Sequence, residues 1–316
     1  MDSLDLGRIF TLTLFASSFR MATPILFATM GGIFSSQSGI FNVGLEALLN
    51  IGAFFAIVGS VNTASPMGGL AYAIGACILA SLVFAFLHLE LKANAIIVGL
   101  AMNIFAGGMT NYLLTTMLDS TGFYRSDLIM GFKELQIPLI KDIPVVSDLI
   151  SGHFPLVYVA FFSVWVVYTI LYKTPFGFHL RSVGENQDAA ESVCINPKKI
   201  KYLGLILCGI FCGFGGTFLS LSYLNLFSEG MVAGRGWLAL AAINFGEAKP
   251  VRSLIACLVF GFADALAIRL QQYGLPSQVV LMLPYVSTLI VLLVSAITDE
   301  RKRKSITAKH QKAESL

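Results

Sequence analysis

Residues 67–91 read MGGLAYAIGACILASLVFAFLHLEL, and no charged side chain occurs in this stretch before Glu90. A helix needs roughly 20 predominantly apolar residues to cross the hydrocarbon core of a bilayer, so this stretch is long enough to span a membrane. Further apolar stretches lie at about 8–32, 42–61, 94–117, 154–172, 202–224, 251–272 and 278–298, with a short one at about 236–246. We expect an all-α, polytopic membrane helical bundle with about eight to ten transmembrane segments.

The composition of the whole chain also indicates a membrane protein. Hydrophobic residues make up 56% of the 316 residues and charged residues only 12%, and the mean hydropathy is +0.78. Soluble globular domains carry roughly 25% charged residues. The apolar stretches are continuous rather than alternating, so they predict spanning helices and exclude a transmembrane barrel.

Two apolar stretches deviate from a simple spanning helix. Arg20 and Pro24 interrupt the first stretch, which predicts a broken or partly interfacial helix there. The stretch at 236–246 is shorter than a spanning helix, so whether it crosses or re-enters the membrane stays open.

Charged residues outside the apolar stretches predict the orientation. The 173–201 loop and the tail after residue 298 are rich in Lys and Arg, whereas acidic residues outnumber basic ones over 118–153. Cytoplasmic segments carry the excess of Lys and Arg. We therefore expect a single transmembrane domain over 1–298, with 118–153 external, 173–201 cytoplasmic and a basic cytoplasmic tail over 299–316. The side of the N-terminus stays open.

Polar side chains recur at helical spacing within two apolar stretches. Asn42, Glu46 and Asn50 follow one another at i, i+4 and i+8, which predicts one face of the second helix. Asn103 and Asn111 share a face of the fourth helix in the same way. Polar groups inside a membrane usually face the bundle interior or a water-filled path. Hydrogen bonds that only hold helices together are the alternative.

Other intramembrane residues are expected to serve packing or pairing. Gly209, Gly213 and Gly216 give the sixth spanning stretch a face of small residues suited to close helix contact. Asp264 and Arg269 are poorly spaced to pair on one helix, so we expect each either to have a partner elsewhere or to snorkel to the membrane surface.

The sequence holds no catalytic constellation. It lacks the G-x-x-x-x-G-K-[ST] phosphate loop, the H-E-x-x-H zinc motif and the G-x-S-x-G nucleophile elbow. The four histidines are scattered, and we expect none of the five cysteines to form a structural disulfide. Cys208 and Cys212 are expected to be small packing residues rather than metal ligands. These patterns predict a protein that is not an enzyme, with no metal, no cofactor and no nucleic-acid partner.

Three stretches resemble one family of membrane proteins. They read GGIFSSQSGIFNVGLE at 31–46, LRSVGEN at 180–186 continuing through Ala189 and Ala190 to Ile195, and EGMVAGRGWLALAA at 229–242. Together they resemble the branched-chain amino acid and simple-sugar permeases of ABC importers, and within that family the nucleoside importer permeases. The resemblance extends over about residues 20–298.

The resemblance implies the transmembrane permease subunit of an ATP-driven importer in the bacterial cytoplasmic membrane. Nucleosides are the expected substrate, with simple sugars and branched-chain amino acids as alternatives. Three protein partners are implied besides membrane lipid, namely an ABC ATPase subunit, a second and different permease subunit, and an extracellular or periplasmic substrate-binding protein. The chain departs from the family pattern at Asn244, a polar residue that could affect the choice of substrate. The expected substrate path comprises Asn42, Glu46, Asn50, Asn103, Asn111 and Asn244.

The basic loop is expected to contain a short helix between Gly184 and Pro197, with Asp188 as its cap. The resemblance implies that this is the coupling helix, which docks on the ATPase, although Cys194 replaces a glycine of the family; an ordinary solvated loop is the alternative. The implied contact residues are Gly184, Glu185, Asn186, Ala189, Ala190 and Glu191.

An ion-coupled secondary transporter is a different class of alternative. It would require an essential intramembrane carboxylate, for which Glu46 and Asp264 are the candidates. Such transporters are commonly built from internal repeats, and the sequence shows no clear repeat.

Overall fold

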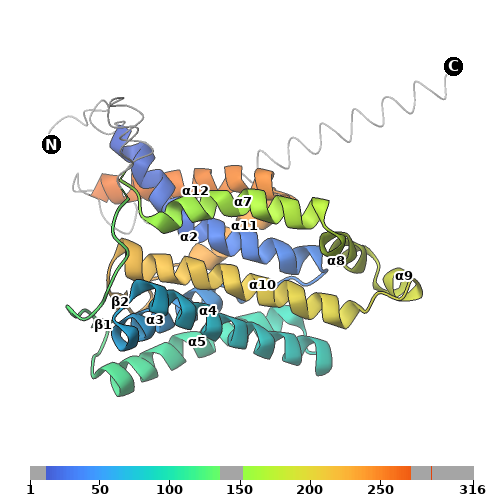
Figure 1. The fold of residues 1–316 in the computed structure, drawn as a ribbon, viewed down its shortest axis with the longest axis horizontal. Helices are drawn as coiled ribbons and strands as arrows, with labels where there is room; N and C mark the ends of the chain where they lie inside the picture. The colour runs from blue at the N-terminus through green and yellow to red at the C-terminus, as the bar shows by residue number, and fades with distance from the viewer. Residues whose placement is uncertain (1–11, 136–151, 272–285, 287–316) are drawn as a thin grey trace.

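The computed structural model describes residues 12–135, 152–271 and 286, and these ranges are almost entirely helical (Figure 1). In chain order the elements are α2 (Leu12–Gln37), α3 (Leu45–Thr63), α4 (Pro66–Ala85), the π-helical turn η1 (Phe86–Glu90), α5 (Ala95–Leu118), β1 (Phe123–Tyr124), α7 (Pro155–Lys173), α8 (Pro175–Glu185), α9 (Gln187–Ser192), α10 (Pro197–Thr217), the π-helical turn η3 (Phe218–Tyr223), β2 (Phe227–Ser228), α11 (Arg235–Phe245) and α12 (Pro250–Gln271). The two short strands pair antiparallel. The expected all-α class is confirmed.

Six helical segments of the described ranges are long and apolar enough to cross a membrane. They are Leu45–Thr63, Pro66–Glu90, Ala95–Leu118, Pro155–Lys173, Pro197–Tyr223 and Pro250–Gln271. Each corresponds to one apolar stretch of the sequence, so the polytopic architecture is confirmed. The last expected span, at 278–298, lies outside the described residues.

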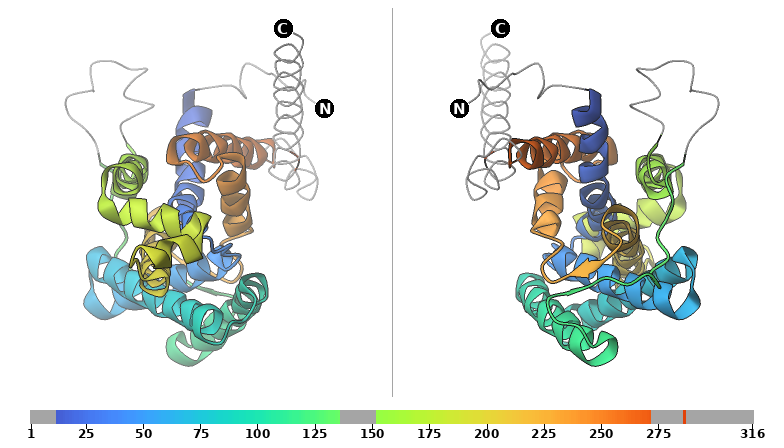
Figure 2. Two further views of the ribbon diagram at one scale, coloured as in Figure 1. Left: turned by 90° about the vertical axis from the view of Figure 1, so that its right-hand side faces the viewer. Right: turned by 90° about the vertical axis from the view of Figure 1, so that its left-hand side faces the viewer.

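Helix α10 lies at the centre of the bundle, where it packs against α2, α3 and α4. Helices α3, α4 and α5 form one side of the bundle, and α2, α7 and α12 form the other (Figures 1 and 2). One large apolar cluster joins the two sides and includes Phe27, Phe54, Phe218 and Phe260, none more than 1% exposed. The core is thus built from helices that are distant in sequence.

Glycines allow α10 to approach its neighbours closely. A Cβ atom on Gly213 would lie 2.9 Å from Cα of Ile74 in α4, and one on Gly216 would lie 2.5 Å from the backbone nitrogen of Ala53 in α3. Any larger side chain would force these backbones apart, which is why small residues recur where membrane helices pack. The packing role predicted for this face is confirmed.

Proline marks the start of five helices. The first residues of α4, α7, α8, α10 and α12 are Pro66, Pro155, Pro175, Pro197 and Pro250. Proline suits this position because the N–H that it lacks would have no partner within the helix. Two of these helices also have a side-chain cap, since Thr174 accepts from the Gly177 N–H at 3.2 Å and Asn196 accepts from the Lys199 N–H at 3.1 Å.

The sequence predicted a broken or partly interfacial helix at Arg20 and Pro24; helix α2 is continuous, so the predicted break is wrong. The helix passes through Arg20 and Pro24 and ends at Gln37. Next to Pro24, the Thr23 hydroxyl donates to the Phe19 carbonyl at 2.8 Å, and the helix packs against α10 and α12 along its length. Neighbouring helices make proline tolerable inside a membrane helix, and here the packing against α10 and α12 outweighs its local effect.

The two ends of the bundle carry different structures. Strands β1 and β2 lie at one end, whereas α8 and α9 lie at the opposite end, with α9 projecting from the bundle (Figure 1). The segments that the charge pattern assigned to opposite sides of the membrane, 118–153 and 173–201, are thus at opposite ends wherever the structure describes them. Residues 136–151 of the first segment lie outside the described ranges.

Candidate functional site

A polar pocket lies between α3, α5 and the turn that precedes α11. Its volume is about 400 Å³. The described residues that line it include no Lys or Arg, so the pocket offers neutral polar groups and carboxylates. They are Glu46, Asn50, Asn103, Gly107, Gly108, Thr110, Asn111, Glu229, Gly230 and Val232.

Glu46 joins the start of α3 to the start of α11. One carboxylate oxygen accepts from the Gly234 N–H at 2.9 Å, and the other accepts from the Gly236 N–H at 2.7 Å. The first N–H groups of a helix have no partner within it and carry partial positive charge, so a carboxylate stabilises them. A Cβ atom on Gly236 would overlap the Glu46 backbone nitrogen, so only glycine permits this approach.

Asn103 holds the start of α3 from the neighbouring helix α5. Its side-chain oxygen accepts from the Ala47 N–H at 2.9 Å, and its side-chain nitrogen donates to the Val43 carbonyl at 3.2 Å. Both bonds satisfy backbone groups that lipid would leave unpaired. Although Asn103 lines the pocket, the amide groups of its side chain are already used to join the two helices.

Asn50 has a free hydrogen-bond acceptor in the pocket. Its side-chain nitrogen donates to the Thr110 hydroxyl at 3.1 Å, and that hydroxyl donates in turn to the Ala106 carbonyl at 2.8 Å. The side-chain oxygen of Asn50 is buried and has no hydrogen-bond partner among the described residues. A buried acceptor without a partner is costly, so it is suited to bind a donor that enters the pocket.

Glu229 was not among the residues selected from the sequence, although it begins the third quoted motif. Its carboxylate accepts a hydrogen bond from the Asn111 side chain; Glu229 is exposed, whereas Asn111 is half-buried. The signal in the sequence was a carboxylate placed a few residues before a short apolar helix. Only the fold brings that carboxylate opposite α5.

Four of the six residues of the predicted path line the pocket, and the other two, Asn42 and Asn244, lie outside it. Asn42 precedes α3 instead of lying on it, because the chain turns between α2 and α3. Its buried side chain accepts from the Gly44 N–H at 2.9 Å and donates to Cys208 at 3.6 Å. Asn244 is exposed at the far end of α11 from Glu46.

Of the two alternatives predicted for the late charged residues, the structure shows the first, a separate partner for each. Asp264 pairs with Arg235 at 3.5 Å, and both side chains are largely buried. The Arg269 guanidinium donates to the Thr13 hydroxyl at 3.1 Å. These contacts tie α12 to α11 and to α2.

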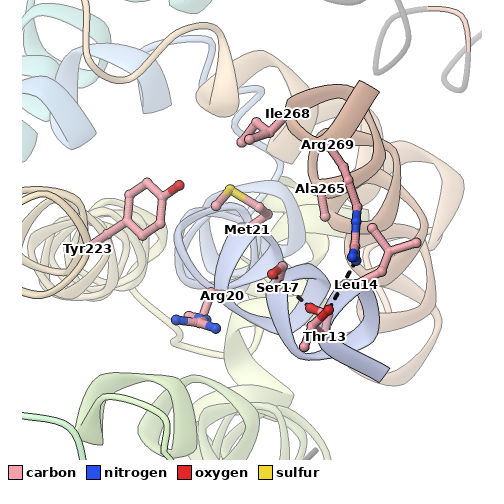
Figure 3. A pocket seen from close by; sticks show the side chains of 9 residues that line it. All are labelled: Thr13, Leu14, Ser17, Arg20, Met21, Tyr223, Ala265, Ile268 and Arg269. Atoms are coloured by element: carbon pink, nitrogen blue, oxygen red, sulfur yellow. Dashed lines mark hydrogen bonds between the residues drawn. The ribbon is translucent and has the colours of Figure 1, made fainter. Parts of the chain in front are cut away.

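A second cavity, of about 290 Å³, lies where α2 begins and α12 ends (Figure 3). Its polar lining includes Arg20, Arg269 and Tyr223. Arg20 points away from Arg269 in this view, and the Arg269 side chain is directed to Thr13. The two cations therefore do not converge on one ligand position.

The predicted coupling segment contains one short helix, α9, and its first two residues, Gly184 and Glu185, are the last two of α8. Asn186, rather than Asp188, caps α9, because its side-chain oxygen accepts from the Ala189 N–H at 3.0 Å. Glu185, Ala189 and Glu191 are exposed.

Two residues of the predicted contact set face the protein itself. Ala190 is only 3% exposed. Gly184 packs against the turn after α2, where an added Cβ atom would overlap the Gln37 carbonyl oxygen and lie 2.9 Å from the Gly39 nitrogen. The surface available to a partner is therefore narrower than the sequence suggested.

The family described as "Branched-chain amino acid transport system / permease component" matches residues 14–294. The chain belongs to this family of ABC permeases. It is thus a multi-pass transport subunit and not an enzyme, and permeases of this kind work with an ATPase and a substrate-binding protein.

Curated relatives cover most of the permease. It is 34% identical to the guanosine ABC transporter permease protein NupQ of Bacillus subtilis, over 86% of its own length and 88% of the relative's. It is also 34% identical to the nucleoside ABC transporter permease protein NupC of Lactococcus lactis, again over 86% and 88%. A putative glucose ABC transporter permease protein of Haloferax volcanii is 28% identical over 94% of this chain and 95% of that protein.

The fold of the permease is also similar to a solved structure. This is an inward-facing conformation of a putative metal-chelate type ABC transporter, with a TM-score of 0.53 and 14% identity over 93% of this chain and 89% of that one. At that identity the likeness supports the fold alone.

Proposed function

We propose that the permease imports nucleosides through the polar pocket between α3, α5 and the turn before α11. The observation that carries the proposal is the buried, unpartnered side-chain oxygen of Asn50 in a pocket whose other lining residues include the Glu229 carboxylate. A nucleoside offers ribose hydroxyls and base N–H groups as donors to these acceptors. A phosphorylated substrate would bring negative charge to a pocket whose described lining lacks Lys and Arg.

The relatives support the same substrate class. Two of them are named for guanosine and nucleosides and share 34% identity with the permease over most of its length. Glucose is the second candidate, because it also presents hydroxyl donors and a glucose-named relative covers 94% of the chain.

Uptake by proteoliposomes containing the permease with its partner subunits tests the substrate. The panel is guanosine, adenosine, uridine, glucose and leucine, each supplied with the cognate binding protein. We expect ATP-dependent uptake of nucleosides and none of leucine. Uptake of glucose without nucleoside uptake would contradict the proposal and support the second candidate.

The exposed face of α9 supports the site proposed for the ATPase. Helix α9 projects from one end of the bundle (Figure 1). Ala189 and Glu191 within α9 are exposed, and so is Glu185 at the end of α8. Val193, which follows α9, is 68% exposed and gives this tip an apolar side chain suited to a groove on a partner. On this proposal the α9 end is cytoplasmic and the β1–β2 end faces the binding protein.

The contacts of the intramembrane carboxylates favour an ATP-driven permease over an ion-coupled transporter. Glu46 accepts two backbone hydrogen bonds at the start of α11, and Asp264 is paired with Arg235. Both carboxylates therefore have partners that explain their position without a bound ion. A second permease subunit, different from this chain, completes the proposed assembly.

A further inference from the structure

Helix α11 is held at both ends by one short segment of the chain. It has 11 residues, which at a rise of about 1.5 Å per residue is roughly half the thickness of a bilayer core. Glu46 binds the Gly234 and Gly236 N–H groups at its start. At its other end, the Gln37 side chain donates to the Ala248 carbonyl at 2.9 Å. Gln37 and Glu46 delimit the segment 37–46, which connects α2 to α3.

Hydrogen bonds within the segment 37–46 and to its neighbours make it stiff. At its start, the Ser38 hydroxyl donates to the Ser35 carbonyl at 2.7 Å, and the Ile40 N–H donates to the same carbonyl at 3.0 Å. Further along, Asn42 accepts from the Gly44 N–H, and Asn103 binds the Val43 carbonyl. A segment with so many of its polar groups paired transmits a displacement instead of absorbing it.

Helix α8 presses directly on this segment. A Cβ atom on Gly184 would overlap the Gln37 carbonyl oxygen and lie 2.9 Å from the Gly39 nitrogen. Gly39 has a φ of +82°, a conformation that glycine adopts without strain, and its own Cβ position lies 3.3 Å from the Gly184 backbone. The contact is therefore backbone against backbone, with no flexible side chain between the two elements.

We propose that the segment 37–46 and α11 move as one rigid unit, which carries a displacement of α8 to the polar pocket. Two positioning residues are involved: Gln37, which holds the unit together, and Gly184, through which α8 contacts it. The chain of contacts runs from Gly184 to Gln37, and from there both along the segment to Glu46 and through Ala248 to the far end of α11. Glu46 lines the pocket, and Glu229 and Val232 line it from the turn that leads into α11. This inference rests on the proposed import function, since the displacement of α8 would come from the docked ATPase.

Gly184→Ala tests the contact between α8 and the segment. The matched control is Gly75→Ala, because a Cβ atom there would meet no atom within 4 Å. Uptake and ATP hydrolysis are measured separately on the reconstituted complex, with whichever substrate the uptake panel identifies. We expect Gly184→Ala to lower uptake per ATP hydrolysed by about tenfold, as for a typical coupling between two sites. The control should keep the wild-type ratio.

A cross-link tests the rigidity without relying on that glycine. Gln37→Cys and Ala248→Cys are combined with Cys194→Ser, because Cys194 is the exposed native cysteine and the other four are buried. A short bifunctional thiol reagent joins the pair, and each single-cysteine variant serves as a control. If the unit is rigid, the cross-linked double-cysteine variant keeps the uptake that the same variant has before treatment.

The outcomes separate this inference from the proposed function. Loss of uptake on cross-linking, or an unchanged ratio of uptake to hydrolysis in Gly184→Ala, would overturn the rigid unit. A substrate other than a nucleoside would contradict the proposed function only, because the ratio can be measured with any substrate that the complex carries.

Discussion

At the residue scale, the site depends on side chains whose hydrogen-bond partners differ although their spacing is alike. Asn50 and Asn103 both line the pocket, yet Asn103 uses its side chain to bind two backbone groups of α3, whereas the oxygen of Asn50 has no partner among the described residues. Of these two residues, only Asn50 is suited to contact a substrate. Residue type and position therefore do not distinguish a structural asparagine from a binding one.

Asn50→Leu should reduce uptake by about tenfold, the value of one lost hydrogen bond of roughly 1–1.5 kcal/mol. The amount of protein in the membrane should not change, because Thr110 keeps its bond to the Ala106 carbonyl. Asn244→Ala is the control, since Asn244 is exposed and lies outside the pocket. Initial uptake rates at matched membrane levels check this, and equal rates for Asn50→Leu and wild type would contradict the role of Asn50.

Glu46→Gln should lower the stability of the purified permease by about 1–3 kcal/mol, because one of two hydrogen bonds to a charged acceptor is lost at the start of α11. Thermal unfolding in detergent measures the change. Glu134→Gln, at an exposed position, should leave the unfolding temperature unchanged. A Glu46→Gln protein as stable as wild type would mean that the carboxylate does not hold α11.

At the element scale, α9 shows which side of a short helix is open to a partner. Its cap, Asn186, separates it from α8, and Ala190 is the residue it buries against the protein. The adjacent Ala189 is exposed. Two neighbouring alanines therefore have opposite environments, which gives a matched pair of variants.

Ala189→Arg should leave membrane insertion and thermal stability intact but weaken ATPase binding by about tenfold, as for an interface residue of moderate importance. Ala190→Arg should instead destabilise the fold, because it buries a charged side chain at a site that is 3% exposed. Co-purification of the ATPase and thermal unfolding distinguish the two effects. If Ala189→Arg assembles and transports like wild type, α9 is a solvated helix and not the ATPase contact.

At the scale of the whole molecule, the bundle separates its two ends by the length of its spanning helices. The β1–β2 pair and the α8–α9 pair lie at opposite ends (Figure 1), and the basic residues of the 173–201 loop favour the α8–α9 end as cytoplasmic. The native cysteines offer a direct test of that orientation.

Cys194 should resist a membrane-impermeant maleimide in intact cells and react after permeabilisation. It is exposed, and the other four cysteines are buried. Asp127→Cys, exposed at the opposite end of the bundle, should react in intact cells and serves as the positive control. Labelling of Cys194 from outside would reverse the proposed orientation.

Local properties of the sequence were enough to determine the membrane class, six spanning helices within the described ranges, the family and the glycine packing face of α10. Apolar length, small residues and motif strings are readable without knowing what each segment contacts.

The course of the helices and the position of the pocket residues could not be predicted from such local properties. Pro24 does not break α2, because the helix packs against α10 and α12, and Asn42 leaves the stripe of Glu46 and Asn50 because the chain turns before α3 begins. The pocket itself, with Glu229 opposite Asn111, and the bonds that hold both ends of α11 join residues far apart in sequence. Such contacts satisfy polar groups that lipid cannot hydrate, and which groups meet is decided only when the helices pack.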